Sequence, residues 1–350
     1  MKREHLLVIR FSALGDVAMT VPVVASLAKQ YPDIRISVLS RPFARPLFQN
    51  LAPNVDFMEA DLKNEYKGIR GLNTLFRRLV AKHPTAIADL HDVLRTQFLR
   101  LRFATAFYPT AHIHKHRQGK RLLCAKNNKL LVQQPTSFQN YVDVFARLGY
   151  PVDISSFRSI FPPQGGDLTL LPKNIGTKGL KEIWIGIAPF AAHQGKMYPI
   201  EKMRILIELL RKEHPSWRLF FFGGGKKEKE QLQQLAQGID RTFVVAGQLH
   251  GLDEELILMS HLDVMVSMDS GNMHLASITA TPVVSIWGAT HPYAGFMGWK
   301  QSEEHCVQLG LPCRPCSVFG NKPCYRGDFA CMNNIKPETI LKSIEHCVMK

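Results

Sequence analysis

Short apolar runs alternate with longer amphipathic stretches along most of this chain. In its first half, runs of Val, Ile, Leu and Phe have the length of buried strands. The stretches between them repeat apolar residues every three or four positions, as helices do. The predicted strands cover residues 5–11, 34–39, 55–58 and 86–90, and the predicted helices cover 17–31, 68–82, 93–103 and 136–148, with one more helix after Pro42. This alternation is typical of a parallel sheet covered by helices.

The alternation returns in the second half, after a stretch rich in proline and glycine at residues 151–180. There, strands are predicted at 182–188, 217–222, 242–246, 264–268 and 282–287, and helices at 199–214, 225–238, 252–261, 271–278 and 336–346. The pattern therefore predicts an α/β protein with two Rossmann-like, doubly wound domains that face each other across a cleft at the carboxyl ends of their strands. We place the domains at 1–165 and 181–335, the linker at 166–180 and a last helix within 336–350.

Composition supports this interpretation. The 350 residues are too many for one ordinary domain and sufficient for two, and 45% hydrophobic with 21% charged residues is typical of a globular protein. The apolar run Leu6 to Ile9 is too short for a signal peptide, and no run approaches the ~18 apolar residues of a membrane-spanning helix. We therefore expect the protein in the cytoplasm.

The seven cysteines are then expected to be free thiols or metal ligands rather than a disulfide framework. Four of them have nearly the spacing of a metal site: Cys313, Cys316, Cys324 and Cys331. They could hold a structural zinc ion or remain unmetallated thiols.

The positive charge is concentrated in one part of the chain. Residues 67–129 contain 14 Lys or Arg and two acids, which accounts for +12 of the total net charge of +15. Such an excess favours an anionic partner over an ordinary solvated face. Nucleic acid, anionic lipid and a phosphorylated glycolipid all fit this charge.

The stretch 263–292 carries the strongest candidate for a binding site. A buried strand ends at Asp269, and Ser270 and Gly271 open a helix that carries His274 one turn inside. The positive end of a helix dipole and its free N–H groups suit a phosphate at this place. Each residue also has a structural alternative, because Ser270 could only cap the helix and His274 could be a satisfied core residue.

The whole string D-S-G-x-x-H-x-A followed by P-V-V-S-I-W-G-A-T-x-P resembles the donor-site signature of glycosyltransferase family 9, the heptosyltransferases of bacterial lipopolysaccharide synthesis. A second string, R-F-S-A-L-G-D-V-A-M-T-V-P, resembles the N-terminal motif of this family. The resemblance implies that Asp16 is the general base, although an aspartate there could also cap the following helix.

Further residues acquire roles from the same resemblance. Lys196 matches the family lysine that contacts the donor phosphate, but Met197-Tyr198 departs from the commoner K-x-W-P form. Asp89-Leu90-His91-Asp92 with Arg95 resembles the family's D-x-Q-G segment on the acceptor side. The donor-binding residues expected in total are Lys196, Gly224, Gly247, Asp269, Ser270, Gly271, His274 and Thr290, and the expected acceptor-binding residues are Asp89, Arg95, Lys120 and Arg121.

The resemblance implies a GT-B fold, in which the N-terminal domain binds the acceptor, the C-terminal domain binds the nucleotide sugar, and the final helix packs back on the first domain. The implied activity is inverting transfer of a heptose from an ADP-sugar to a lipopolysaccharide core acceptor at the inner membrane face, by a monomer. No D-x-D occurs in the chain, so no metal or other cofactor is expected. Two alternatives remain: a GT-B transferase or epimerase that uses a UDP- or GDP-sugar, and a nucleic-acid-binding protein that uses the basic stretch 67–129.

Overall fold

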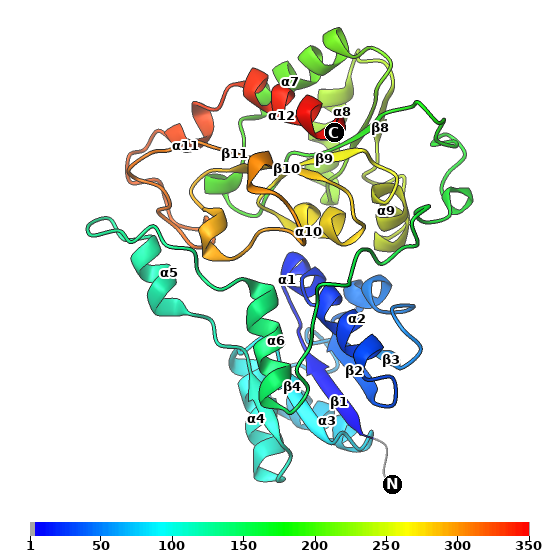
Figure 1. The fold of residues 1–350 in the computed structure, drawn as a ribbon, viewed down its shortest axis with the longest axis vertical. Helices are drawn as coiled ribbons and strands as arrows, with labels where there is room; N and C mark the ends of the chain where they lie inside the picture. Colours follow the sequence, from blue (N-terminus) through cyan, green and yellow to red (C-terminus); the bar gives the residue numbers. More distant parts are fainter. Residues whose placement is uncertain (1–3, 350) are drawn as a thin grey trace. The chain divides into compact units, whose positions relative to one another are not determined.

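A computed structural model describes residues 4–349, which form two compact units (Figure 1). Of these residues, the first unit contains 4–115 and 136–160, and the second contains 116–135 and 161–349. Two α/β units were predicted, and this part of the prediction is confirmed. The boundary at 160/161 precedes the predicted linker, because residues 166–180 pack within the second unit.

Unit 1 is a parallel five-stranded sheet in the order β3-β2-β1-β4-β5. The helix α2 packs against α6, and α3 packs against α4, so that helices form two layers over the sheet. β1 lies in the middle of the sheet with all five of its residues buried. The strands are β1 (His5–Ile9), β2 (Arg35–Ser40), β3 (Val55–Glu59), β4 (Ala86–Asp89) and β5 (Thr110–His112), and the helices are α1 (Leu14–Ala18), α2 (Val21–Gln30), α3 (Gly68–Val80), α4 (Leu94–Thr105) and α6 (Ser137–Arg147).

Two elements of unit 1 differ from the prediction. The single helix predicted over 17–31 is two helices, α1 and α2, because Pro22 stands in the first turn of α2, where its missing N–H costs nothing. The helix predicted after Pro42 is a short 3-10 helix, η1 (Pro42–Leu47). The break before α2 leaves Asp16 on a five-residue helix of its own.

Unit 2 is a parallel six-stranded sheet in the order β11-β10-β9-β6-β7-β8. In both units the strand order reverses beside the first strand of the unit, which is the arrangement of doubly wound sheets. The strands are β6 (Trp184–Ala188), β7 (Arg218–Phe221), β8 (Thr242–Val244), β9 (Val264–Met268), β10 (Val283–Trp287) and β11 (Cys306–Gln308). The helices are α5 (Arg117–Leu123), α7 (Ile200–Glu213), α8 (Gly225–Ala236), α9 (Leu252–Met259), α10 (Gly271–Ile278), α11 (Ala330–Asn333) and α12 (Pro337–Val348), with short 3-10 helices η2 (Leu168–Leu170), η3 (Gln194–Lys196), η4 (Pro292–Ala294) and η5 (Glu303–His305).

The segment 116–135 belongs to unit 2, although the predicted N-terminal domain included it. Its helix α5 contacts η4, and the backbone N–H of Gln134 donates to the carbonyl of Tyr293 at 2.8 Å. The Nζ of Lys129 donates to the carbonyls of Pro312 and Pro315 at 3.1 and 2.9 Å. Because polar contacts hold this segment on unit 2, its sequence has no hydrophobic periodicity from which the packing could be predicted.

The sequence analysis expected the last helix, α12, to pack on the N-terminal domain. Its buried residues Ile340, Leu341 and Ile344 lie in the core of unit 2, where α12 packs against α7 and the strands β9 to β11. The buried face of the final helix therefore completes the core of the second unit. Within residues 4–349 no helix has the length and apolar character needed to cross a bilayer.

Candidate functional site

The two candidate sites lie where parallel strands end side by side. In unit 1, Ile9 pairs with Leu39 and Asp89, so the turns that follow β1 and β4 are neighbours. In unit 2, Ser267 of β9 pairs with Ala188 of β6. These are the positions at which doubly wound sheets bind their ligands. They contain Asp16 in one unit and Asp269 in the other.

Asp16 lies on α1, and its carboxylate is held on two sides. Its Oδ2 is 2.9 Å from Nη2 of Arg10 and accepts a hydrogen bond of 3.1 Å from the backbone N–H of Ala13. The Asp16 side chain is 33% exposed, whereas that of Arg10 is 9% exposed. The arrangement fixes the carboxylate and still leaves it accessible to a substrate hydroxyl.

Arg10, which the sequence analysis did not single out, holds Asp16 in place. Its Nη1 donates to the carbonyl of Leu90 at 2.6 Å, and its guanidinium lies 5.9 Å from the ring centre of Tyr141. The Tyr141 hydroxyl in turn donates to the backbone carbonyl of Asp16 at 3.3 Å. An arginine directly after four buried apolar residues was the available signal, because a charge at such a place needs a partner.

His91 lies on the same edge of unit 1. Burial, together with the charges of Arg10 and Lys115, lowers its pKa to about 3. Its Nδ1 accepts a hydrogen bond of 3.4 Å from the backbone N–H of Phe11, and the two rings meet edge to face. His91 is therefore a neutral imidazole at physiological pH, with its proton on Nε2.

Protonation of His91 is expected to cost stability in acid. The unfolded chain binds this proton near the ordinary pKa of about 6.5, and the folded chain binds it only near 3, so stability is lost progressively as pH falls from 6.5 toward 3. The loss at pH 5 relative to pH 8 should be about 2 kcal/mol from this residue. Denaturant unfolding of the wild type and of His91→Gln at both pH values measures it. An equal loss in both proteins would contradict the prediction.

Asp89 and Arg95, both predicted to bind the acceptor, have different environments. Asp89 is fully buried; its Oδ1 accepts hydrogen bonds of 2.9 Å from the N–H groups of His91 and Asp92, and its Oδ2 lies 2.9 Å from Arg100. This geometry gives Asp89 the role of holding the turn after β4. Arg95 is exposed, close enough to lower the pKa of His91, and has no ion pair among residues 4–349. Of the two, Arg95 is available to an acidic ligand.

In unit 2, α10 begins as the sequence predicted. Ser270 is the residue before its first turn and has extended backbone, but its hydroxyl makes no capping bond and lies 3.3 Å from the hydroxyl of Ser267. The first N–H groups of a helix have no helical acceptor. An anion can therefore bind at this helix start, where the helix dipole is positive.

Lys196 lies beside that helix start. Its Nζ is 3.0 Å from Oδ2 of Asp269, and both side chains are largely buried, at 16% and 5% exposed. Lys196, Asp269 and the start of α10 are thus brought together, as predicted. The pairing with Asp269 was not predicted, and it holds the ammonium group near the place where a phosphate would bind.

The Cys-rich segment supports this lysine. Gly320 has φ +75°, and a Cβ there would lie 2.4 Å from Cγ of Lys196. Gly195 is equally constrained, since a Cβ would lie 2.9 Å from Cβ of Ala289. The loop after β6, the loop after β10 and the Cys-rich segment therefore pack closely, and glycine is required where they touch.

Thr290 follows β10 and is fully buried, and its hydroxyl has no hydrogen-bond partner among residues 4–349. The neighbouring Arg314 was missed by the sequence analysis. It donates to the carbonyls of Thr290 at 2.8 Å and Leu309 at 2.5 Å, and also to that of Gly288. Arg314 thereby shapes the loop that carries Thr290, although nothing local in the sequence marks it.

The remaining predicted donor residues occupy the same edge of the sheet. His274 is buried in α10. Gly224 precedes α8, and its N–H donates to Oε2 of Glu228 at 2.7 Å. Gly247 follows β8 with φ +76°, and a Cβ there would meet the Nζ of Lys229 at 2.7 Å. Glycine at 247 thus lets Lys229 approach the backbone.

Lys120 and Arg121, predicted on the acceptor side of the N-terminal domain, belong to unit 2 with the rest of α5. Lys120 is buried, with its Nζ 4.1 Å from the ring centre of Phe296. Arg121 is exposed and lines a cavity of about 480 Å³ together with Cys124 and Tyr325. Arg121 is therefore the more accessible of the two cations.

The cysteines do not form a metal-binding group in the described part of the chain, where no three His, Cys, Asp or Glu residues are arranged to hold an ion. All seven are free thiols. Burial raises the pKa of Cys331 to about 11. The spacing of Cys313, Cys316, Cys324 and Cys331 suggested zinc, but the fold uses the segment to pack against the Lys196 loop.

Solved structures show the same fold. A glycosyltransferase family 9 protein from Veillonella parvula aligns with a TM-score of 0.77 at 19% identity, covering 100% of this chain and 98% of that one. The E. coli heptosyltransferase WaaC, solved with ADP, aligns with a TM-score of 0.68 at 18% identity, covering 98% and 99%. Both likenesses extend over the whole chain, and the heptosyltransferases have the GT-B fold.

Sequence comparison agrees. Lipopolysaccharide heptosyltransferase 1 of Campylobacter coli is 24% identical over 97% of both chains, and lipopolysaccharide heptosyltransferase 3 of E. coli is 23% identical over 84% of this chain and 85% of its own. The model of glycosyltransferase family 9 (heptosyltransferase) matches residues 73–323, which is well over half of the chain. The protein thus belongs to glycosyltransferase family 9, the heptosyltransferases.

Proposed function

We propose that this enzyme transfers a heptose from ADP-heptose to a lipopolysaccharide core acceptor, with inversion at the anomeric carbon. The observation that carries the proposal is the uncapped start of α10 beside Lys196, a site for a diphosphate at the edge of the unit 2 sheet. The ADP seen with WaaC supports adenine as the nucleobase. The curated relatives act on lipopolysaccharide, which supports the acceptor.

The chemistry follows from the groups at the two edges. Asp16 takes the proton of the acceptor hydroxyl as its oxygen attacks the anomeric carbon. The bond between that carbon and the diphosphate oxygen breaks on the opposite face, so the configuration inverts and ADP leaves with the bonding electrons. Lys196 and the N–H groups at the start of α10 stabilise the charge that develops on the diphosphate. In this mechanism no metal is required.

Titration of the purified protein with ADP, UDP, GDP and a short DNA duplex tests the proposal, followed by a transfer assay with ADP-heptose in excess EDTA. We expect ADP to bind selectively and transfer to persist in EDTA. Selective binding of UDP or GDP would mean that the donor is a UDP- or GDP-sugar and not ADP-heptose. Binding of DNA alone, weakening steeply with salt, would mean that the basic residues 67–129 are the functional surface.

We also propose that the protein attaches to the inner membrane face as a monomer. The outward side of α4 supports this, because Leu94 and Leu101 are 85% and 62% exposed and Phe107, just after the helix, is 95% exposed. Arg95 and Arg102 are exposed on the same helix, and the only acids of the stretch 67–129 are Asp89 and Asp92 at the end of β4. Apolar side chains among cations suit the interface of an anionic bilayer.

Sedimentation with phosphatidylglycerol vesicles should show binding that falls at least about tenfold in Leu101→Glu/Phe107→Glu, because the variant replaces apolar contacts by charge repulsion. Leu180→Glu is the matched control, since Leu180 is at least as exposed but lies in unit 2. Vesicle binding that is equal in all three proteins would exclude this surface, as would an absence of binding by the wild type.

A further inference from the structure

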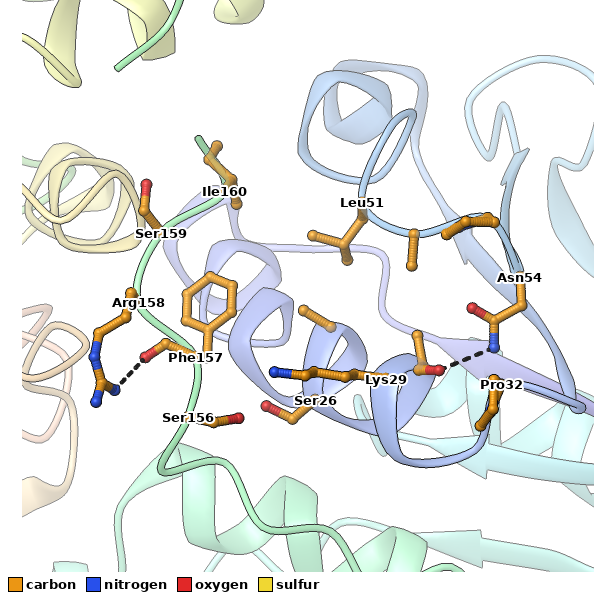
Figure 2. A pocket seen from close by; sticks show the side chains of 14 residues that line it. Ser26, Lys29, Pro32, Leu51, Asn54, Ser156, Phe157, Arg158, Ser159 and Ile160 are labelled. Carbon is orange, nitrogen blue, oxygen red and sulfur yellow. Dashed lines mark hydrogen bonds between the residues drawn. The ribbon is translucent and has the colours of Figure 1, made fainter. Parts of the chain in front are cut away.

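Unit 1 contains a cavity of about 570 Å³ away from the Asp16 edge (Figure 2). Its walls come from the C-terminal half of α2, from the turn 51–54 before β3, and from residues 156–160, the last of unit 1 before the chain enters unit 2. Asp16 precedes the start of α2, and the ten residues of α2 extend about 15 Å. The cavity is therefore at the opposite end of α2 from the proposed general base.

One side of the cavity presents donors without partners. Ser26 is 3% exposed, and its hydroxyl has no hydrogen-bond partner among residues 4–349. Lys29 lies three residues after Ser26 on α2 and has no ion pair within the same residues. Ser156 lines the facing wall of the cavity. In Figure 2 the polar ends of Ser26, Lys29 and Ser156 point toward one another. A buried hydroxyl without a partner costs stability unless a ligand or water satisfies it.

The rest of the lining is mostly apolar, with Asn54, Arg158 and Ser159 as its polar members, and contains no acid. Phe157, Leu51 and Ile160 form the wall across from Lys29 in Figure 2, and Ala25 and Ala28 leave space on α2 because their side chains are small. The guanidinium of Arg158 donates to carbonyls of its own segment, and its Nη1 lies 2.6 Å from the carbonyl oxygen of Ser155. One end of the cavity thus suits an anion, and the remainder suits a short hydrocarbon group.

We propose that this cavity is a second ligand site that binds a phosphate monoester with a small apolar group. An ammonium group and two hydroxyls on two walls match the several oxygens of a phosphate, and the ring of Phe157 packs against the apolar part. The site is separate from the one that carries the proposed transferase activity. Neither Asp16 nor Lys196 lines it, so the proposal stands without that activity.

Calorimetric titration of the full-length protein with hexyl phosphate, inorganic phosphate and hexanol tests the site. Hexyl phosphate should bind at least about tenfold more tightly than inorganic phosphate, since burial of two methylene groups alone supplies that factor. Lys29→Ala should weaken hexyl phosphate at least about tenfold, and Ala25→Leu, which adds three carbon atoms to the cavity wall, should also weaken its binding. Lys63→Ala is the control, because Lys63 is an exposed lysine of unit 1 outside the cavity.

Three results would overturn the proposal: no binding of hexyl phosphate, equal binding by wild type and Ala25→Leu, or equal weakening by Lys29→Ala and Lys63→Ala. A parallel titration with vesicles that contain phosphatidic acid identifies the source of the phosphate. Binding to such vesicles that depends on Lys29 indicates a lipid headgroup, and binding of hexyl phosphate alone indicates a soluble ester. ADP affinity should be unchanged in Ala25→Leu, which separates this site from the nucleotide site.

Discussion

Asp16→Asn should lower the rate of sugar transfer by about 10² to 10⁴-fold, because the amide can no longer accept the proton of the attacking hydroxyl. The affinity for ADP should stay within a factor of about two, since Asp16 lies in unit 1 and the proposed diphosphate site lies in unit 2. Steady-state transfer and ADP titration on the same preparation measure both quantities.

The matched control is Asp56→Asn. Asp56 is also a unit 1 carboxylate paired with an arginine, Arg35, at 2.5 Å, but it lies on β3 away from the candidate site. Asp16→Asn should also lose about 1–3 kcal/mol of stability, because the largely buried Arg10 loses its charged partner. Normal turnover by Asp16→Asn would mean that Asp16 only secures the first turn of α1 through the N–H of Ala13.

Lys196→Ala should weaken ADP binding by about 10 to 100-fold. The substitution removes a cation and also leaves the carboxylate of Asp269, only 5% exposed, without its partner beside the diphosphate. The double variant Lys196→Ala/Asp269→Asn should therefore recover part of the loss, because the uncompensated negative charge is gone. Calorimetry with ADP on both variants measures the difference.

Unit 2 offers a control on the same strand. Lys178 pairs with Asp263 at 2.7 Å just before β9, whereas Lys196 pairs with Asp269 just after it. Lys178→Ala therefore removes a comparable ion pair from the opposite end of β9, and ADP affinity should not change. Equal losses in the two lysine variants would indicate a general effect on unit 2 rather than contact with the diphosphate.

Local pattern accounts for the elements that were predicted correctly. β1 and β9 are runs of five residues that are all buried, and strands of this kind are readable because both faces of a parallel sheet are covered. The start of α10 was equally readable, since the strand, Asp269, Ser270 and Gly271 follow one another without interruption. The family signature at the same residues indicated what this helix start binds.

Interactions between distant segments account for what was missed. The segment 116–135 was assigned to the first domain because it follows that domain in the chain, but its backbone N–H at Gln134 and the Nζ of Lys129 donate to the carbonyls of Tyr293 and Pro315. The pairing of Lys196 with Asp269 joins residues 73 positions apart. Neither the periodicity nor the composition of the sequence predicts polar contacts of this kind.

By itself, the sequence therefore determined the two doubly wound sheets and the start of α10, and it singled out Asp16 as a candidate base, because each is encoded by neighbouring residues. Only the tertiary structure decided that Arg10 holds Asp16, that Asp89 is buried as a support, and that α5 and α12 complete unit 2. Hydrophobic periodicity is local, so it can be read directly from the amino-acid sequence. Long-range hydrogen bonds and ion pairs exist only once the folded chain has brought their partners together.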